Sequence, residues 1–118
     1  MADRCKQVVI FGHSFVTHFE SFLESSPTRW NLGLDTDRFS VHLHGIRGLT
    51  LKDARLYSAD KGLEGADLVI IDIGSNDVAD PAVDCNRVAI RLVAFAEYVL
   101  YGLEAKSVVL SFGGRTHE

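Results

Sequence analysis

The stretch Leu68-Val69-Ile70-Ile71-Asp72-Ile73-Gly74-Ser75-Asn76-Asp77 decides how this chain folds. It begins as a mostly apolar run rich in β-branched residues, which is typical of a strand covered on both faces. It ends in four small or polar residues, Gly74–Asp77. Open parallel α/β sheets carry their ligand chemistry at the carboxyl ends of their strands. This ending is therefore a candidate site.

Two other apolar runs end in a similar way. Val8–Phe11 leads into Gly12-His13-Ser14, and Phe39–His44 leads into Gly45-Ile46-Arg47-Gly48. A fourth run, Val108–Phe112, closes the pattern. Because parallel strands present their carboxyl ends at one edge of a sheet, we expect the three polar endings to converge in one crevice.

Helical patterns separate the four runs. Apolar residues recur at helical spacing in Ser14–Ser25, in about Thr50–Ser58 and in Val83–Leu103. The resulting order β-α-β-α-β-α-β predicts right-handed crossovers and a parallel sheet. Residues 39–44 alternate apolar and polar side chains, which indicates an edge strand. The chain is therefore predicted to be an α/β three-layer sandwich with a flavodoxin-like strand order of 2-1-3-4.

Length and composition indicate a single globular domain over residues 1–118. The chain is 47% apolar and 24% charged, with a net charge of −4. This acidic balance argues against binding to a nucleic-acid backbone, and no apolar run is long enough to cross a membrane. Cys5 and Cys85 lie far apart and in no metal-ligand spacing, which fits inert thiols in a reducing compartment. We therefore expect a cytoplasmic protein.

Three residues of the polar endings could act together on an acyl group: Ser14, Gly48 and Asn76. Ser14 lies at the start of a predicted helix, where N–H groups and the helix dipole favour an oxyanion. Gly48 lacks a Cβ, so its backbone N–H can approach a ligand closely. Asn76 carries a side-chain NH₂ donor. This set suits a tetrahedral acyl intermediate and requires neither a cofactor nor a metal.

The same strings resemble the first three conserved blocks of the SGNH (GDSL-like) hydrolases. The resemblance rests on Val9-Ile10-Phe11-Gly12-His13-Ser14, on Gly45-Ile46-Arg47-Gly48-Leu49-Thr50 and on Gly74-Ser75-Asn76-Asp77. In that family the blocks supply the serine nucleophile, an oxyanion-hole glycine and an oxyanion-hole asparagine. Position by position, the resemblance places these roles on Ser14, Gly48 and Asn76. It implies a serine esterase that hydrolyses carboxylic (acyl or acetyl) esters of small substrates.

The sequence departs from the family pattern at two points. His13 stands where the family has an aspartate before the nucleophile. The family's final Asp-x-x-His block, which supplies the general base, has no counterpart, because the sequence ends at Arg115-Thr116-His117-Glu118. We therefore expect an incomplete domain of this type. A serine without a base is a poor nucleophile at neutral pH, and His18 and His117 are the remaining candidates for that role.

Each site residue also has an ordinary structural explanation. Ser14 could cap a helix, and Asn76 with Asp77 could form a turn. Gly48 could be a loop glycine, with Gly45 in its functional role.

Other residues with chemical potential are assigned structural roles. His42 and His44 share a strand face, but no third ligand accompanies them, so we interpret them as solvated side chains rather than metal ligands. Phe15, Phe19 and Phe22 form a helical stripe that we assign to the core.

Two rival functions remain open. A catalytically inactive SGNH-like module would keep the fold for binding or assembly, and the sequence also resembles domains carried by some retrotransposon-encoded proteins. The second rival is a nucleotide- or phosphate-binding doubly wound domain, which is disfavoured because no glycine-rich phosphate loop follows the first strand. Because the family's fifth strand has no counterpart here, Val108–Phe112 is expected to form an unpaired edge strand, which favours pairing with a second copy of the chain.

Overall fold

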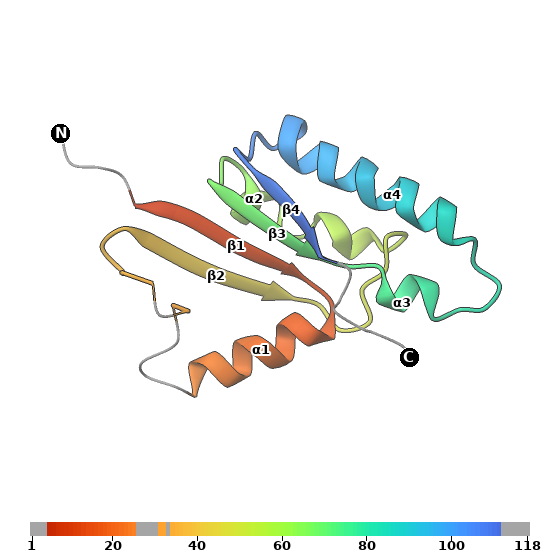
Figure 1. Ribbon diagram of the computed structural model, residues 1–118, viewed down its shortest axis with the longest axis horizontal. Coiled ribbons are helices and arrows are strands. Elements are labelled where there is room, and N and C mark those ends of the chain that lie inside the picture. The colour runs from red at the N-terminus through yellow and green to blue at the C-terminus, as the bar shows by residue number, and fades with distance from the viewer. Residues whose placement is uncertain (1–4, 26–30, 33, 112–118) are drawn as a thin grey trace.

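One parallel sheet organises the chain (Figure 1). The computed structural model describes residues 5–25, 31–32 and 34–111, with the side chains of these residues except Ser14, Phe15, Glu20 and Leu23. Its strands are β1 (Lys6–Gly12), β2 (Phe39–Gly45), β3 (Leu68–Asp72) and β4 (Val108–Ser111). They pair in the order β2-β1-β3-β4, and all three pairings are parallel. The predicted strand order is confirmed; Phe112 lies outside the described residues.

The connections between the strands are helical. They comprise α1 (Ser14–Glu24), the 3₁₀-helix η1 (Ala54–Tyr57), α2 (Asp60–Leu63), α3 (Ser75–Val78), α4 (Cys85–Glu97) and the π-helical turn η2 (Tyr98–Gly102). In Figure 1, α1 lies beside β2 and α4 lies on the far side of the sheet.

The apolar stripe predicted for the helix at Val83–Leu103 is confirmed, and it runs from α4 through η2. Its five residues are all buried: Val88, Leu92, Phe95, Val99 and Leu103. They belong to one core cluster with Phe11 of β1 and Ile71 of β3. Each such side chain contributes about 1.5–3 kcal/mol when it leaves water, so this face of the sheet holds most of the hydrophobic stabilisation.

α1 packs on the opposite face of the sheet. Side chains alternate along a strand, so Gly12 lies on the face of β1 opposite to Phe11. A Cβ on Gly12 would lie 3.0 Å from the Val16 side chain, and a Cβ on Gly45 would lie 2.4 Å from the Thr17 backbone nitrogen. The glycines that end β1 and β2 thus let α1 approach the sheet closely. The predicted three-layer sandwich is confirmed.

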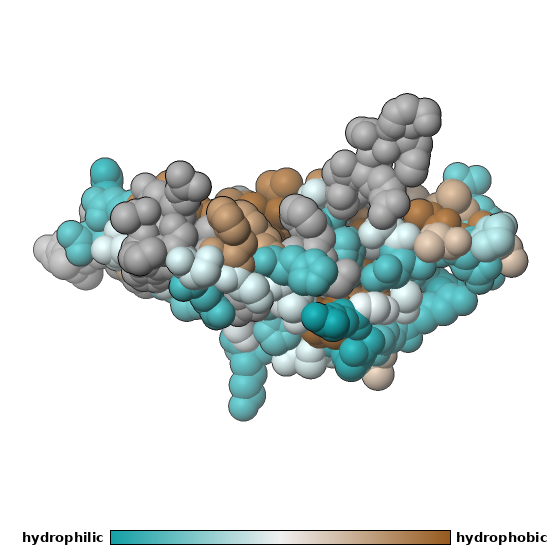
Figure 2. Space-filling view, turned by 90° about the horizontal axis from the view of Figure 1, so that it is seen from below, coloured by the Kyte–Doolittle hydropathy of each residue, from teal (hydrophilic) through white to brown (hydrophobic). Residues whose placement is uncertain are grey.

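The core assignment of the phenylalanine stripe on α1 is wrong at Phe22, whose side chain is 53% exposed. Phe19 is half-buried, and the side chain of Phe15 lies outside the described residues. Among the described side chains of α1, Val16 is the fully buried one. Only the side of α1 that faces Gly12 and Gly45 meets the sheet, which leaves Phe22 at the surface. The face drawn in Figure 2 carries apolar areas, in brown, among polar side chains.

The helix predicted at about Thr50–Ser58 is replaced by η1 and α2. The Asp53 side chain accepts the backbone N–H of Arg55 at 2.9 Å, so it caps the helix and delays its start to Ala54. The hydrogen bond from the Arg55 guanidinium also holds the pKa of Asp53 below its ordinary value. Lys61 and Gly62, which follow the predicted helix in the sequence, lie inside α2.

α4 is shorter than the predicted Val83–Leu103 helix. The Asp84 side chain accepts the backbone N–H of Asn86 at 2.9 Å, so the helix begins at Cys85. At the other end the Leu103 N–H donates to the Tyr98 carbonyl at 3.0 Å, five residues back, which widens the last turn into η2.

Tyr98 is expected to titrate at a higher pH than an ordinary tyrosine. Its hydroxyl donates a hydrogen bond to the Asp60 carboxylate, and this bond is the main cause that raises the pKa of Tyr98 to about 12. Because the folded pKa lies above the ordinary value of 10.0, the bond stabilises the fold below pH 10.0 and is lost as the pH rises through about 12. Phenolate absorbance measures this titration. Asp60→Asn should return Tyr98 towards its ordinary pKa; an unchanged titration would contradict the assignment.

Candidate active site

The three predicted site residues follow strands that end at the same edge of the sheet, in register with one another. Gly12 pairs in register with Gly45 of β2 and with Asp72 of β3. The Ile46 N–H, at the start of the loop after β2, donates to the Gly12 carbonyl at 2.8 Å. The expected convergence of the three strand ends is therefore present in the backbone.

Ser14 is the first residue of α1, immediately beyond the end of β1. The N–H groups of Val16 and Thr17 donate to the His13 carbonyl at 3.0 and 3.4 Å. His13 therefore occupies the N-cap position, and the alternative in which Ser14 is the cap residue is wrong by one position. The side chain of Ser14 lies outside the described residues.

Gly48 and Gly45 are glycines for different physical reasons. Gly48 has a φ of +69° in an exposed loop, and a Cβ there would meet no atom within 4 Å. The left-handed backbone conformation favours glycine at this position. Gly45 instead makes room for the backbone of Thr17. Of the two candidates, Gly48 is the one in an open loop that a ligand can approach.

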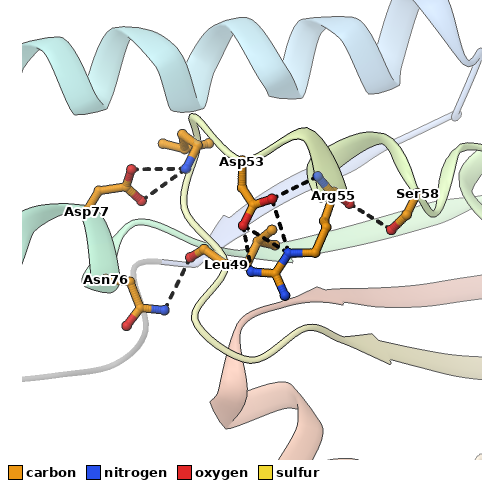
Figure 3. Close-up of polar contacts among 7 residues, drawn as sticks. Leu49, Asp53, Arg55, Ser58, Asn76 and Asp77 are labelled. Atoms are coloured by element: carbon orange, nitrogen blue, oxygen red, sulfur yellow. Dashed lines mark hydrogen bonds and ion pairs between the residues drawn. The ribbon is translucent and has the colours of Figure 1, made fainter.

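Asn76 joins the loop after β3 to the loop after β2. Its side-chain Nδ2 donates to the Leu49 carbonyl at 3.2 Å, directly beyond Gly48. The neighbouring Asp77 carboxylate accepts the Leu51 N–H at 3.0 and 3.3 Å. Figure 3 shows both contacts, with Asn76 and Asp77 reaching the same loop. Leu49 is fully buried and Asp77 is 9% exposed, so these bonds are well shielded from water.

The Asn76 amide retains one donor for a ligand. An asparagine NH₂ carries two hydrogens, and Asn76 makes one side-chain hydrogen bond within the described part of the chain. Because that bond anchors the amide, its second N–H is held in a defined direction. Asp77, which sequence reasoning grouped with Asn76 as a turn residue, has instead a buried role as the acceptor that secures the loop after β2.

His13 forms a second link, between the loops after β1 and β3. It is 7% exposed, and its Nε2 lies 3.0 Å from Ser75 Oγ and 3.6 Å from Asp72 Oδ1. Its backbone N–H donates to the Asp72 carbonyl at 3.2 Å. Sequence reasoning did not find this cluster. The available signal was Asp72 itself, a carboxylate inside an otherwise apolar run.

The other histidines differ in their exposure and in their contacts. His18 is exposed on α1, and His117 lies outside the described residues, so neither is brought to the site by a described contact. His42 is exposed, as predicted, with its Nε2 near Ser40 Oγ and Gln7 Oε1. His44 is half-buried instead, because its ring packs on Phe11 with 5.5 Å between centroids.

A hollow of about 500 Å³ lies away from the converging loops. Gln7, Val9, His42 and His44 line it, together with the segment from Ser58 to Ala66. Its described lining includes neither Gly48 nor Asn76, so it is separate from the candidate site.

The fold is shared with solved structures of ester hydrolases. A protein of Bacteroides fragilis named as an acylhydrolase aligns with 89% of this chain at a TM-score of 0.64 and 21% identity. The acetyl xylan esterase AlAXEase aligns with 88% of the chain at 0.59 and 23% identity. A GDSL-like lipase of Bacteroides thetaiotaomicron aligns with 93% at 0.59 and 21% identity. The chain has a GDSL-like hydrolase fold.

The structural similarity covers only part of each neighbouring chain. The alignments cover 47%, 56% and 51% of those three chains, so this sequence spans about half the length of these neighbours. No family model matches the sequence, and no curated protein does. Within the described residues of this GDSL-like fold, no helix is long and apolar enough to span a bilayer.

Proposed function

We propose that the chain carries an ester-hydrolase site in which Ser14 Oγ bonds to the acyl carbon while its proton passes to solvent water. The ester C–O bond then breaks and the alcohol leaves, and water hydrolyses the acyl-serine to release the carboxylic acid. The Gly48 N–H and the Asn76 amide bind the oxyanion that forms, together with the Ser14 N–H at the start of α1. The observation that carries this proposal is the hydrogen bond from Asn76 Nδ2 to the Leu49 carbonyl. It holds the asparagine amide beside the residue that follows Gly48, although the two loops come from different strands.

The chemistry requires neutral donors rather than a cation. Negative charge develops on the carbonyl oxygen as the serine oxygen adds to the ester, and N–H groups held in place stabilise that charge without reorganising. An 11-residue helix such as α1 adds the positive end of its dipole at the same point. Carboxylic esters with a small acyl group are the proposed substrate class, and the reaction needs no cofactor.

Ser14→Ala is expected to abolish hydrolysis of p-nitrophenyl acetate and labelling by a fluorophosphonate, because it removes the attacking oxygen. Ser21→Ala is the matched control, since Ser21 is an exposed serine of the same helix. Turnover is measured by nitrophenolate release and labelling by mass. Equal rates for the wild-type protein and Ser14→Ala would remove Ser14 from the proposed role.

A non-catalytic assembly module is the second candidate function, and the exposure of β4 favours it. β4 pairs only with β3 among the described strands, and the Val109 side chain is 49% exposed. An edge strand with apolar exposed side chains offers unpaired backbone groups to another chain. A second copy of this chain, pairing along β4, is the proposed partner.

Val109→Lys is expected to convert a self-associating sample to a monomer, because a charge on an edge strand opposes strand pairing. Val93→Lys is the matched control: Val93 is also 49% exposed, but it lies on α4. Light scattering across a range of protein concentrations measures the mass. A wild-type protein that stays monomeric throughout, or equal dissociation by both variants, would contradict pairing through β4.

A further inference from the structure

We propose that Ser75 and His13 form a second nucleophile–base pair, able to accept an acyl group at the same edge of the sheet. The inference takes its ester substrate from the proposed function but does not depend on Ser14. Ser75 Oγ lies 3.0 Å from His13 Nε2, within hydrogen-bond distance. A serine hydroxyl held against an imidazole nitrogen is the arrangement that activates a serine for attack. Ser75 as a residue is half-buried.

Asp72 gives this pair its electrostatic support. Its Oδ1 lies 3.6 Å from the same His13 Nε2, which is too long for a hydrogen bond but short enough for an ion pair. When the neutral imidazole carries its proton on Nδ1, the Nε2 lone pair accepts the Ser75 O–H. Once Nε2 takes that proton, the carboxylate stabilises the imidazolium. His13 and Asp72 are 7% and 5% exposed, so water screens this attraction weakly.

The chain contains a second serine–histidine contact that lacks these features. Ser40 Oγ lies 2.9 Å from His42 Nε2, but this nitrogen also lies 3.1 Å from Gln7 Oε1. An amide oxygen can only accept, so His42 Nε2 must carry a proton to bond to Gln7 and cannot then accept one from Ser40. His42 is also exposed to solvent. Ser40 is therefore an internal reference for a serine near a histidine that does not act as its base.

The proposed step balances as an acyl transfer. Ser75 Oγ bonds to the acyl carbon while its proton moves to His13 Nε2, and the ester C–O bond then breaks as His13 returns the proton to the leaving alcohol. Water completes the cycle by the same route and releases the carboxylic acid. With a fluorophosphonate, the Oγ–P bond forms, the P–F bond breaks and fluoride leaves.

The test maps the fluorophosphonate adduct on the intact wild-type chain by peptide mass spectrometry. We expect an adduct on Ser75 that forms at least about 10²-fold faster than any adduct on Ser40, the low end for general-base assistance. His13→Gln should slow modification of Ser75 by a similar factor, whereas His42→Gln should leave it unchanged. Thermal melts of both variants report their folding, and the wild-type map decides the matter if His13→Gln unfolds.

The outcomes separate this inference from the proposed function. An adduct on Ser75 supports the inference, whether or not Ser14 is also modified, and modification of Ser75 alone would remove Ser14 from the proposed function. Modification of Ser14 alone would overturn the inference and leave the proposed function standing. A chain modified at neither serine, or at Ser75 no faster than at Ser40, would overturn the inference. The absence of any Ser14 adduct in that case would count separately against the proposed function.

Discussion

Gly45→Ala is expected to lower the free energy of unfolding by about 1–3 kcal/mol, the usual cost of forcing extra volume into a packed interface. The new Cβ would lie 2.4 Å from the backbone nitrogen of Thr17 and 2.8 Å from its Cα. These are backbone atoms of α1, so a side-chain rotation cannot relieve the overlap and the helix must move away from β2. Ser14 begins that helix, so hydrolysis should fall as well. Denaturant unfolding measures the stability.

Gly62→Ala is the matched control for this experiment. Gly62 lies inside α2, and a Cβ there would meet no atom within 4 Å. Alanine is favoured over glycine inside a helix by about 0.5–1 kcal/mol, so this variant should be neutral or slightly more stable. If Gly45→Ala matched the stability of Gly62→Ala, the close approach of α1 to the end of β2 would be wrong.

Asn76→Ala is expected to lower kcat for ester hydrolysis by about 10²–10³-fold, the typical cost of removing one oxyanion-hole donor. The loss has two parts: the donor disappears, and the hydrogen bond to the Leu49 carbonyl no longer holds the two loops together. Asn76→Asp retains the side-chain volume but has no N–H and adds a negative charge beside the oxyanion. It should therefore be at least as inactive as Asn76→Ala. Steady-state kinetics with p-nitrophenyl acetate provides the measurement.

Asn86→Ala controls for the loss of an asparagine as such. Asn86 lies exposed in the first turn of α4, and its backbone N–H rather than its side chain contacts Asp84. Its replacement should leave kcat unchanged. Retention of full turnover by a folded Asn76→Ala protein would exclude the amide as an oxyanion donor. A parallel fall in stability with intact kcat would reduce its role to holding the loop.

Much of the fold could be predicted from residues close together in the sequence. The continuous apolar run of β3 and the alternating pattern of β2 distinguish a central strand from an edge strand, and the strand order follows from that distinction and from right-handed crossovers. The buried apolar residues of the predicted Val83–Leu103 helix recur at helical spacing. The predicted helix ends were less accurate. The starts of η1 and α4 are each determined by one capping side chain, Asp53 for η1 and Asp84 for α4.

The arrangement of the candidate site depended on contacts that no local pattern contains. Asn76 and Leu49 are 27 residues apart, and Ser75 and His13 are 62 residues apart. The Ser75–His13 contact depends on the register of Gly12 with Asp72. The Asn76–Leu49 contact also depends on the register of Gly12 with Gly45, so both exist only once the strands have paired. A one-residue slip would turn each side chain to the other face. Residue periodicity therefore predicts which loops converge, whereas assembly of the sheet decides which atoms in those loops touch.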